Sequence, residues 1–383
     1  MEAKFYKRYD TVHRFVRRLV CPVIARKLNF SGDEIPSDRG PMFILCNHNT
    51  DFDFLLLTLQ CEKPLDFVAT ETMLRMGSLS RLAARTLKPV LHDKGSKGAA
   101  TIKQIVQRIK DGRNVVLFPE GNRSFDGRTG EVSNAIGKIA KMSGGTLVVY
   151  RITGGYFTTP RWGRGIRRGR MNGKVMGVYS LKQLAEMKAP ELLQVIRDGL
   201  MTDAYEEQKE NPASFRSKVK AEYLESLLFT CPDCKKIGSL RSKGDVLSCE
   251  CGYKLIADDQ GYLKDNGDIK HKITDLFADQ KDYLNEMTQI TGTDCIWSDE
   301  VRMQKLSVNH SIVADEAAVL QVYRDRIEVN GNPVKRDDLA SIDIVQRNRL
   351  IIHVIGSDVR YEFTGEETFN AVKYRIWFEI SFA

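Results

Sequence analysis

The sequence predicts an α/β domain followed by a small cysteine-rich module and a β-rich C-terminal domain. In the first half of the chain, apolar runs such as residues 42–45 and 115–118 have the length and composition of buried strands, and they alternate with helical patterns. Two closely spaced cysteine pairs follow, at residues 231–234 and 249–251. Short strand-like runs are then frequent in residues 301–383.

The length indicates more than one domain, because 383 residues exceed the size at which a single hydrophobic core usually stops growing. We expect the α/β domain over residues 1–213, and a helix (214–229) leading into the cysteine-rich module over residues 214–256. Residues 257–300 are expected to form an acidic connector, since positions 254–300 hold eleven acidic residues against five Lys and Arg. The β-rich domain then covers residues 301–383.

The first chemically informative motif is residues 47–53, which lies between a strand-like run and an apolar helical run. His48 is placed at the turn from strand to helix, where Thr50 or Asp51 can cap the helix and Asp53 can point back at the imidazole. A histidine whose tautomer is fixed by a carboxylate is a suitable base for activating a hydroxyl nucleophile. The alternative is a histidine that only satisfies core or capping hydrogen bonds, with Asp53 exposed on the helix.

The second motif is residues 118–124, which follows the strand-like run 115–118 and contains a glycine turn. Ligand sites of open α/β sheets lie outside the carboxyl ends of the strands, so this motif is expected beside the first. Arg123 offers a planar guanidinium for a phosphate group. Glu120 can hold that guanidinium or bond a substrate hydroxyl. The alternative is an ordinary surface Glu–Arg turn, which would contribute little energy.

Together, these motifs resemble the first and third blocks of the glycerolipid (lysophospholipid) acyltransferase superfamily. Residues 88–97 resemble the second block, although Lys94 stands where Arg is expected to contact the phosphate of the acceptor. The fourth block corresponds to residues 147–152, without its usual proline. The resemblance covers roughly residues 10–200, and it implies a mixed sheet flanked by helices for residues 1–213.

The resemblance implies an O-acyltransferase of the 1-acylglycerol-3-phosphate acyltransferase type. A lysophospholipid hydroxyl would attack an acyl thioester, carried by coenzyme A or acyl carrier protein, in a single step. His48 would take the hydroxyl proton, Asp53 would stabilise the imidazolium, and backbone N–H groups near Gly121 would receive charge on the thioester oxygen. Lys94, Glu120 and Arg123 would contribute to substrate binding.

Three alternatives remain open at this point. The acceptor can be another lipid, such as an amino-acid or sugar lipid. The chain can be a catalytically inactive adaptor for membranes or nucleic acid on the same scaffold. Cys46 can be the nucleophile in place of a direct transfer, because it lies two residues before His48, although its position in an apolar run is typical of a buried thiol.

Positive charge gathers in two segments, while the net charge of the whole chain is +8. Residues 1–30 hold eight Lys and Arg against two acids, and residues 151–174 hold seven against none. On a helical wheel, apolar side chains of the first segment share one side, opposite three arginines; the apolar set is Val12, Phe15, Val16, Leu19, Val20 and Val23, and the arginines are Arg14, Arg17 and Arg18. This amphipathic helix, with Pro22 kinking or ending it, either lies on a membrane surface with anionic lipids or packs its apolar side on the domain's own core.

The second basic segment interleaves Trp162 with arginines and glycines. This composition suits contact with anionic lipid headgroups, with Trp162 as an anchor. Nucleic acid is the rival polyanion, and we do not expect it as the partner. No stretch approaches the roughly 18 uncharged apolar residues of a membrane-spanning helix, and basic residues interrupt any signal-peptide core. We therefore expect a cytoplasmic protein, peripheral on the cytoplasmic face of a membrane.

Four of the eight cysteines form two knuckles, Cys231 with Cys234 and Cys249 with Cys251. Four thiolates at this spacing are typical of a zinc ribbon that binds structural Zn²⁺. The second knuckle has one spacer residue where two is commoner. Disulfides are the alternative, which a reducing compartment disfavours. A four-thiolate site leaves no position for water, so the zinc is expected to stabilise the module without taking part in catalysis.

The C-terminal region contains five strand-like runs and a final amphipathic helix; the runs are residues 319–323, 326–329, 342–345, 349–354 and 360–363. Asn330-Gly331 marks a tight hairpin. Antiparallel strands closed by one C-terminal helix resemble a pleckstrin-homology or GRAM-type module, which implies a membrane or partner adaptor. The alternative is a small β domain that only stabilises the chain.

Overall fold

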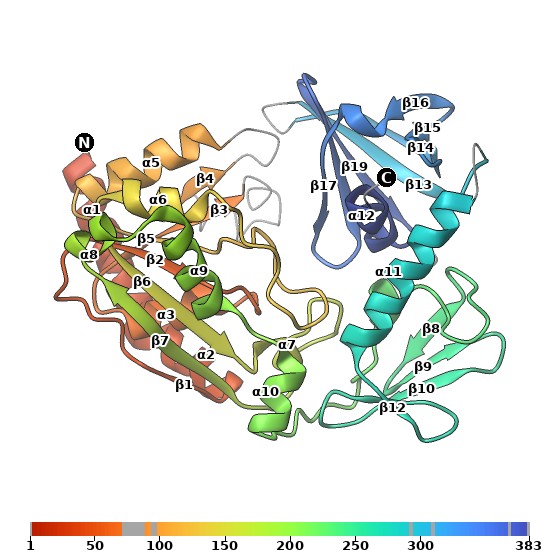
Figure 1. The fold of residues 1–383 in the computed structure, drawn as a ribbon, viewed down its shortest axis with the longest axis horizontal. Coiled ribbons are helices and arrows are strands. Elements are labelled where there is room, and N and C mark those ends of the chain that lie inside the picture. Colours follow the sequence, from red (N-terminus) through yellow and green to blue (C-terminus); the bar gives the residue numbers. More distant parts are fainter. Residues whose placement is uncertain are drawn as a thin grey trace. The chain divides into compact units, whose positions relative to one another are not determined.

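The computed structural model describes residues 2–70, 89–92, 98–290, 294–307, 311–366 and 369–380. The chain divides into two compact units, and each is described by itself (Figure 1). The first unit contains residues 1–161 and 165–217, and the second contains residues 162–164 and 218–383. The chain therefore contributes a short segment of three residues to the second unit before it completes the first.

The first unit is an α/β domain built on a mixed sheet, as the sequence pattern and the resemblance led us to expect. Among the described residues, seven strands follow the order β1-β7-β6-β2-β5-β3-β4. Strands β2, β5, β3, β4 and β6 run parallel, and β7 is antiparallel to β6. In that spatial order the strands span Phe30–Gly32, Met171–Tyr179, Thr146–Thr153, Met42–Cys46, Asn114–Leu117, Leu65–Thr70 and Val90–His92.

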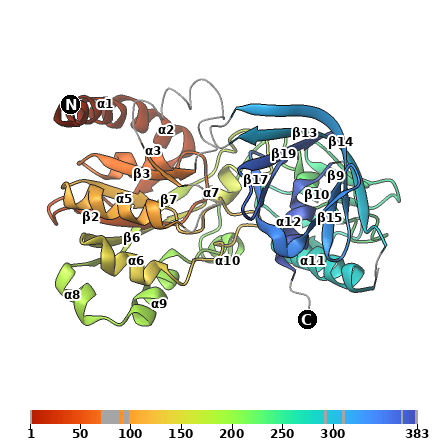
Figure 2. The same ribbon diagram turned by 90° about the horizontal axis from the view of Figure 1, so that it is seen from above.

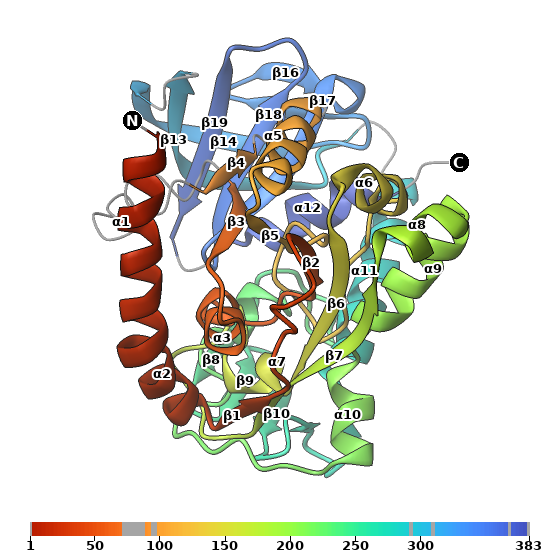
Figure 3. The same cartoon turned by 90° about the vertical axis from the view of Figure 1, so that its left-hand side faces the viewer.

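Helices cover both faces of this sheet because the buried strands are apolar on both sides. Met42 and Ile44 of β2 pack with α2 (Cys21–Leu28) and α3 (Asp53–Gln60). Phe43 of the same strand packs on the other face, where four helices lie. These helices are α5 (Ala99–Lys110), α6 (Ile136–Ser143), α8 (Leu181–Glu186) and α9 (Ala189–Leu200). Figure 3 shows α2 and α3 on one side of the sheet and α6, α8 and α9 on the other. The short helices α7 (Gly155–Thr158) and α10 (Ala204–Glu210) also belong to the unit.

The regular part of the N-terminal helix ends before Pro22, whereas the sequence analysis expected Pro22 itself to kink or end it. Helix α1 (Glu2–Phe15) passes through a π-helical turn, Val16–Val20, into α2, where Pro22 lies in the first turn. Much of the apolar side that the sequence predicts faces outward, with Phe15 59%, Leu19 58% and Val23 64% exposed. Other side chains contact the core in their place; they are Tyr9, His13, Cys21, Ala25 and Leu28. Within the described residues, no helix is long and apolar enough to span a bilayer.

The cysteine-rich module of the second unit is a small antiparallel sheet in the order β12-β11-β10-β9-β8. Its strands β8 to β12 span Leu240–Lys243, Val246–Cys249, Lys254–Ala257, Leu263–Lys264 and Lys270–His271. The helix expected over residues 214–229 is wrong, because only the 3₁₀ turn Leu224–Ser226 forms there.

Residues 257–300 fold as part of the second unit and do not form a connector. Helix α11 (Ile273–Ile290) occupies most of the segment, with Leu276, Phe277 and Leu284 buried along one side. Gln280 of this helix donates its side-chain N–H to the carbonyl of Leu227 at 2.8 Å and accepts the N–H of Phe229 at 3.0 Å. The acidic residues occupy the remaining surface, which explains why composition alone suggested a connector.

The C-terminal region is β-rich, as predicted, and the described residues form an antiparallel sheet in the order β16-β15-β14-β13-β19-β18-β17. Strands β13 to β19 span Trp297–Ser307, Ile312–Val322, Arg326–Val329, Asn332–Lys335, Leu339–Val345, Arg349–Val354 and Val359–Gly365. Asn330 and Gly331 both have positive φ angles, 50° and 76°, as the predicted hairpin turn requires. Helix α12 (Ala371–Glu379) packs against β17 and α11 (Figure 2). Its expected apolar face is buried.

Candidate active site

The two motifs of the first unit meet at one edge of the sheet. Parallel strands β2 and β5 pair with Leu45 opposite Leu117, so the segments that follow them leave the sheet side by side. Two hydrogen bonds join the segments. The N–H of Ser124 donates to the carbonyl of His48 at 3.0 Å, and the N–H of His48 donates to Oε1 of Glu120 at 2.7 Å.

His48 and Asp53 form a direct pair, with Nδ1 of the ring 2.8 Å from Oδ2 of the carboxylate. A carboxylate oxygen only accepts, so we assign the proton to Nδ1 and leave Nε2 as the acceptor for a substrate proton. The Asp53 side chain is fully buried, whereas that of His48 is 26% exposed. The ring is therefore accessible and its partner is not. This arrangement excludes the alternative in which Asp53 is an exposed helix residue.

The Asp53 carboxylate is held by the turn that precedes α3. Oδ2 accepts the backbone N–H groups of Asn49 and Thr50 at 2.7 and 2.9 Å, and Oδ1 accepts the Thr50 hydroxyl at 2.6 Å. Thr50 Oγ1 in turn accepts the N–H of Phe52 at 3.0 Å. Of the two residues expected to cap the helix, Thr50 bonds a backbone N–H just before α3. Asp51 instead forms an ion pair with Arg123.

The loop that carries His48 is fixed by residues that the sequence analysis did not single out. Asn47 exchanges two hydrogen bonds with the backbone of Ile152 in β6, at 2.8 and 2.7 Å. Asn49 donates to the same carbonyl at 2.9 Å. The ring of Phe118 stacks on His48, with centroids 4.4 Å apart. The signal for these roles was available, since all three residues lie within the two motifs.

Glu120 accepts two backbone N–H groups and so connects three segments. Oε1 accepts from His48, and Oε2 accepts from Gly130 at 2.6 Å. Burial of the carboxylate raises the pKa of Glu120 to about 8; the negative charge of Asp53 adds to this, and the two hydrogen bonds oppose it. The sequence analysis expected Glu120 to hold the Arg123 guanidinium. In the structure its carboxylate bonds the backbone N–H groups of His48 and Gly130 instead.

Arg123 is largely buried, and its guanidinium contacts the His48 loop. Nε and Nη2 donate to the carbonyl of Asn49 at 3.3 and 3.2 Å, and Nη2 also donates to the carbonyl of Thr159. Nη1 pairs with the Asp51 carboxylate at 2.7 Å, and this aspartate is 71% exposed. The guanidinium thus already holds one anion at the edge of the site.

Gly121 has a positive φ of 66°, and its N–H donates to the carbonyl of Phe118 at 3.1 Å. This amide bonds within the turn, and the expected role of backbone N–H groups near Gly121 toward a thioester oxygen stays a prediction. Lys94, the remaining expected phosphate contact, lies outside the described residues.

Part of this unit is similar to a known family. Residues 27–153 match the Acyltransferase family. The matched segment contains both motifs of the site, so His48, Asp53, Glu120 and Arg123 all lie inside it. Among solved structures, the chain is similar to the 1-acyl-sn-glycerophosphate (LPA) acyltransferase PlsC from Thermotoga maritima, with 19% identity, coverage of 49% of this chain and 78% of that chain, and a TM-score of 0.41. No curated protein matched the chain.

Cys46 of strand β2 is fully buried and belongs to the apolar cluster under α2 and α3. Burial raises the pKa of its thiol well above the usual value, and the charges of Asp53 and Glu120 add to this. A buried neutral thiol is a poor nucleophile. The structure therefore disfavours Cys46 as a nucleophile.

Trp162, the expected headgroup anchor, is only 4% exposed and belongs to the second unit. Its carbonyl accepts Nε of Arg347 at 2.8 Å, and the carbonyl of Gly163 accepts Nη2 at 3.2 Å. The same guanidinium lies 3.7 Å from the centre of the Tyr223 ring. The anchor interpretation is wrong, because this tryptophan packs inside the protein.

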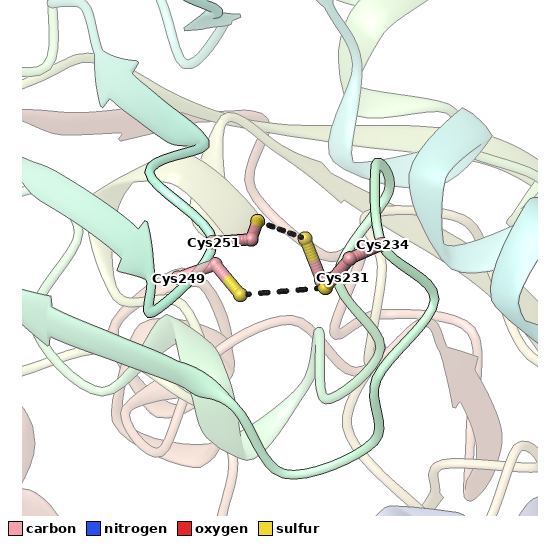
Figure 4. Close-up of side chains that lie close together, drawn as sticks. All are labelled: Cys231, Cys234, Cys249 and Cys251. Carbon is pink, nitrogen blue, oxygen red and sulfur yellow. Dashed lines mark hydrogen bonds between the residues drawn. The ribbon is translucent and has the colours of Figure 1, made fainter.

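The four knuckle cysteines converge on one point (Figure 4), with all sulfur atoms within 4.8 Å of one another. Cys231 and Cys251 are 3.7 Å apart at sulfur, as are Cys234 and Cys249. Tetrahedral Zn–S bonds of about 2.3 Å place neighbouring sulfurs about 3.8 Å apart, so the residues fit a four-thiolate site. The single-residue spacer of the second knuckle is compatible with this geometry.

Proposed function

We propose that the protein is an O-acyltransferase that moves a fatty acyl group from an acyl thioester to the hydroxyl of a lysophospholipid, with 1-acylglycerol-3-phosphate as the acceptor, at a membrane surface. The observation that carries this proposal is the pair of accessible His48 and buried Asp53, 2.8 Å apart, inside the segment that matches the Acyltransferase family. The pair supplies a base whose tautomer is fixed.

In this mechanism Nε2 of His48 accepts the acceptor's hydroxyl proton while the hydroxyl oxygen forms a bond to the thioester carbonyl carbon. The carbon–sulfur bond breaks, and the imidazolium returns the proton to the departing thiolate. Asp53 stabilises the imidazolium between the two proton transfers. Either acyl-CoA or acyl carrier protein supplies the thioester, because the reacting atoms are the same.

Arg123 would bind the acceptor's phosphate, together with Lys94. The exposed Asp51 carboxylate occupies the Nη1 position of this guanidinium. A phosphate oxygen that displaces it would gain a charge-assisted bond, while the other guanidinium bonds keep the His48 loop in place.

Membrane binding is supported by the outward side of the N-terminal helices. Phe15, Leu19 and Val23 are exposed on the helical segments that also carry the exposed Arg14 and Arg18. An apolar strip flanked by arginines suits an interface with anionic lipids. We therefore propose peripheral attachment at the cytoplasmic face of a membrane, with the N-terminal helices as the contact.

The second unit would support this enzyme without taking part in the chemistry. We propose that the four cysteines bind a structural Zn²⁺, which fixes the two knuckles and offers no open position to a substrate. The antiparallel sheet closed by α12 supports the proposed pleckstrin-homology or GRAM-type adaptor role.

The test is product formation by the purified full chain on vesicles that contain phosphatidylglycerol. Acyl-CoA and acyl-loaded carrier protein are each combined with 1-acylglycerol-3-phosphate, with a lysophospholipid of different headgroup, and with no acceptor. The proposal predicts phosphatidate, identified by mass, only with the first acceptor. Product from another lipid alone would contradict the assigned acceptor, and no product with any pair would contradict the enzyme assignment.

A further inference from the structure

Three exposed arginines of the first unit, Arg168, Arg170 and Arg216, share one surface. Arg168 and Arg216 form an antiparallel bridge, in which each backbone N–H donates to the carbonyl of the other residue at 3.0 and 2.9 Å. Residues directly opposite each other in such a bridge place their side chains on the same face. Exposure alternates along residues 168–174, as in an extended segment, which places Arg170 on that face too.

Packing on the other face keeps these side chains directed outward. A Cβ on Gly169 would collide with the ring of Phe215, so this ring lies directly against the glycine backbone. Phe215 is 3% exposed and packs on Phe157, with ring centroids 5.2 Å apart. Residues 169 and 215 therefore face the core, and the arginines that alternate with them face outward.

The charges of these arginines are not compensated within the protein. Like charges directly opposite each other in a sheet destabilise the folded state. None of the three guanidinium groups has a hydrogen bond or an ion pair with the part of the chain that the structure describes. Arg128 of the same unit, in contrast, pairs with Asp203 at 3.0 Å. An arrangement that costs stability and lacks an internal partner is typical of a functional site, here one for an anion.

Helix α7 connects this surface to the candidate active site. A Cβ on Gly155 would come within 2.8 Å of the Asn49 side chain, so α7 packs closely on the loop that carries the proposed base. At the other end of α7, the carbonyl of Thr158 accepts the N–H of Arg167 at 2.8 Å. Arg168 follows directly in the sequence. An anion held by the arginines would therefore lie near the site, separated from the reacting atoms by α7.

The surroundings of the arginines favour a small phosphate-bearing ligand. A guanidinium offers two parallel N–H bonds to a phosphate group. Within the described residues, no large apolar side chain is exposed in segments 165–180 and 202–217. A protein partner would need an apolar centre to its interface, and a lipid-binding segment combines basic with exposed apolar residues. A carrier protein and a membrane surface are therefore disfavoured here.

We propose that Arg168, Arg170 and Arg216 bind the phosphate groups of coenzyme A when acyl-CoA is the donor. In acyl-CoA the pantetheine arm separates these phosphates from the thioester. The phosphates would thus bind beyond α7 while the thioester reaches the active-site loop. This inference rests on the proposed acyl transfer, and it selects acyl-CoA over acyl carrier protein as the donor.

Binding of coenzyme A to the full chain, measured by calorimetry without an acceptor, tests the site independently of turnover. Arg168→Gln and Arg216→Gln are each expected to weaken this binding about tenfold, whereas Lys138→Gln, at an exposed position on α6, leaves it unchanged. Coenzyme A that lacks the 3′-phosphate should bind the parent chain about fivefold more weakly than coenzyme A. Equal affinities of the parent and both arginine variants for coenzyme A would overturn the proposal.

Urea unfolding separates a binding role from a structural one. Each arginine substitution removes a like-charge contact, so the midpoint without ligand should equal or exceed that of the parent chain. Lower midpoints in both variants would contradict this account of the pair. If either variant does not fold, Arg170→Gln replaces it with the same expected loss of coenzyme A binding.

Steady-state kinetics distinguishes the donor from other anions. The KM for palmitoyl-CoA should rise about tenfold in both variants, while the KM for palmitoyl-pantetheine and for 1-acylglycerol-3-phosphate stays unchanged. A loss confined to palmitoyl-loaded carrier protein, to the acceptor or to binding of phosphatidylglycerol vesicles would assign the arginines elsewhere and overturn the proposal. If the variants lose coenzyme A binding but the parent chain transfers no acyl group, the phosphate site stands and the proposed function fails.

Discussion

Oδ2 of Asp53 lies 2.8 Å from Nδ1 of His48 and also accepts two backbone N–H groups of the turn that carries the histidine. One buried carboxylate thus fixes both the ring and its loop. Asp53 is also the first residue of helix α3, so the proposed base is oriented by a side chain whose backbone position the helix fixes.

Asp53→Asn is expected to lower kcat by about a hundredfold or more, because the amide no longer stabilises an imidazolium and can favour the wrong tautomer. It should also reduce the free energy of unfolding by about 1–3 kcal/mol, since a buried charge-assisted acceptor is lost. Steady-state rates and urea unfolding measure the two effects. Asp51→Asn is the matched control for loss of a carboxylate in this loop. A fully active Asp53→Asn enzyme would contradict the role of the aspartate.

Asp51→Asn is itself expected to change acceptor binding. The substitution removes the anion that pairs with Nη1 of Arg123, so the KM for 1-acylglycerol-3-phosphate should fall about two- to fivefold, with kcat nearly unchanged. Arg123→Lys should raise the same KM, because an ammonium lacks the planar fork. Unchanged KM values in both variants would show that Arg123 does not bind the phosphate.

Glu120 gives a pH dependence of stability with a definite sign. Its pKa is raised from 4.5 to about 8 in the folded chain, so the folded state binds more protons than the unfolded state between these values. The stabilisation is full below pH 4.5 and is lost as the pH rises toward 8, with a slope of up to about 1.4 kcal/mol per pH unit.

Glu120→Gln should remove this pH dependence of the free energy of unfolding. Any destabilisation by the amide itself is the same at every pH. Relative to the parent chain, the variant should therefore be more stable at pH 8 than at pH 5. Urea unfolding of both proteins across that range measures the difference. Glu131→Gln, at an exposed position nearby, serves as control. Parallel pH profiles for Glu120→Gln and the parent chain would contradict the raised pKa.

Cys234→Ser is expected to abolish stoichiometric zinc binding, because three thiolates and a hydroxyl make a much weaker site. Elemental analysis and a thermal unfolding scan measure the loss of metal and of stability. Cys295→Ser is the control, as this exposed cysteine lies outside the cluster. A parent chain purified without metal, and unable to take up zinc, would contradict the proposed site.

Leu19→Glu should weaken binding to phosphatidylglycerol vesicles about tenfold, because it places a negative charge in the exposed apolar strip. Vesicle sedimentation measures the partition. Met142→Glu is the control, because it adds the same charge at a position on α6 that is 62% exposed. It should bind the vesicles as the parent chain does. The membrane proposal fails if both variants bind as the parent does.

The sequence was informative wherever local pattern determines structure. Alternating apolar strands and helical patterns predicted an α/β domain, and the parallel pairing of β2 with β5 brings His48 and Glu120 together, as expected for segments that follow neighbouring strands. The Asn330-Gly331 turn could be predicted because only left-handed backbone closes so short a hairpin.

Tertiary partners decided the features that the sequence could not predict. Phe15 and Leu19 are exposed beside and within a π-helical turn over Val16–Val20, and no local pattern specified that turn. Glu120 bonds backbone amides in place of Arg123, because the loop at Gly130 returns to it. Trp162 is 4% exposed, and its carbonyl is bonded by Arg347, a residue distant in the sequence.

The most direct test of the account is the rate of acyl transfer by His48→Ala on phosphatidylglycerol vesicles, with 1-acylglycerol-3-phosphate and acyl-CoA at saturation. His353→Ala, in the second unit, controls for loss of an imidazole, and a thermal scan and zinc content establish that both variants fold. The account predicts that His48→Ala loses at least about a thousandfold in kcat while His353→Ala is unaffected. A folded His48→Ala protein that retains most of the activity would contradict the assignment of His48 as the base.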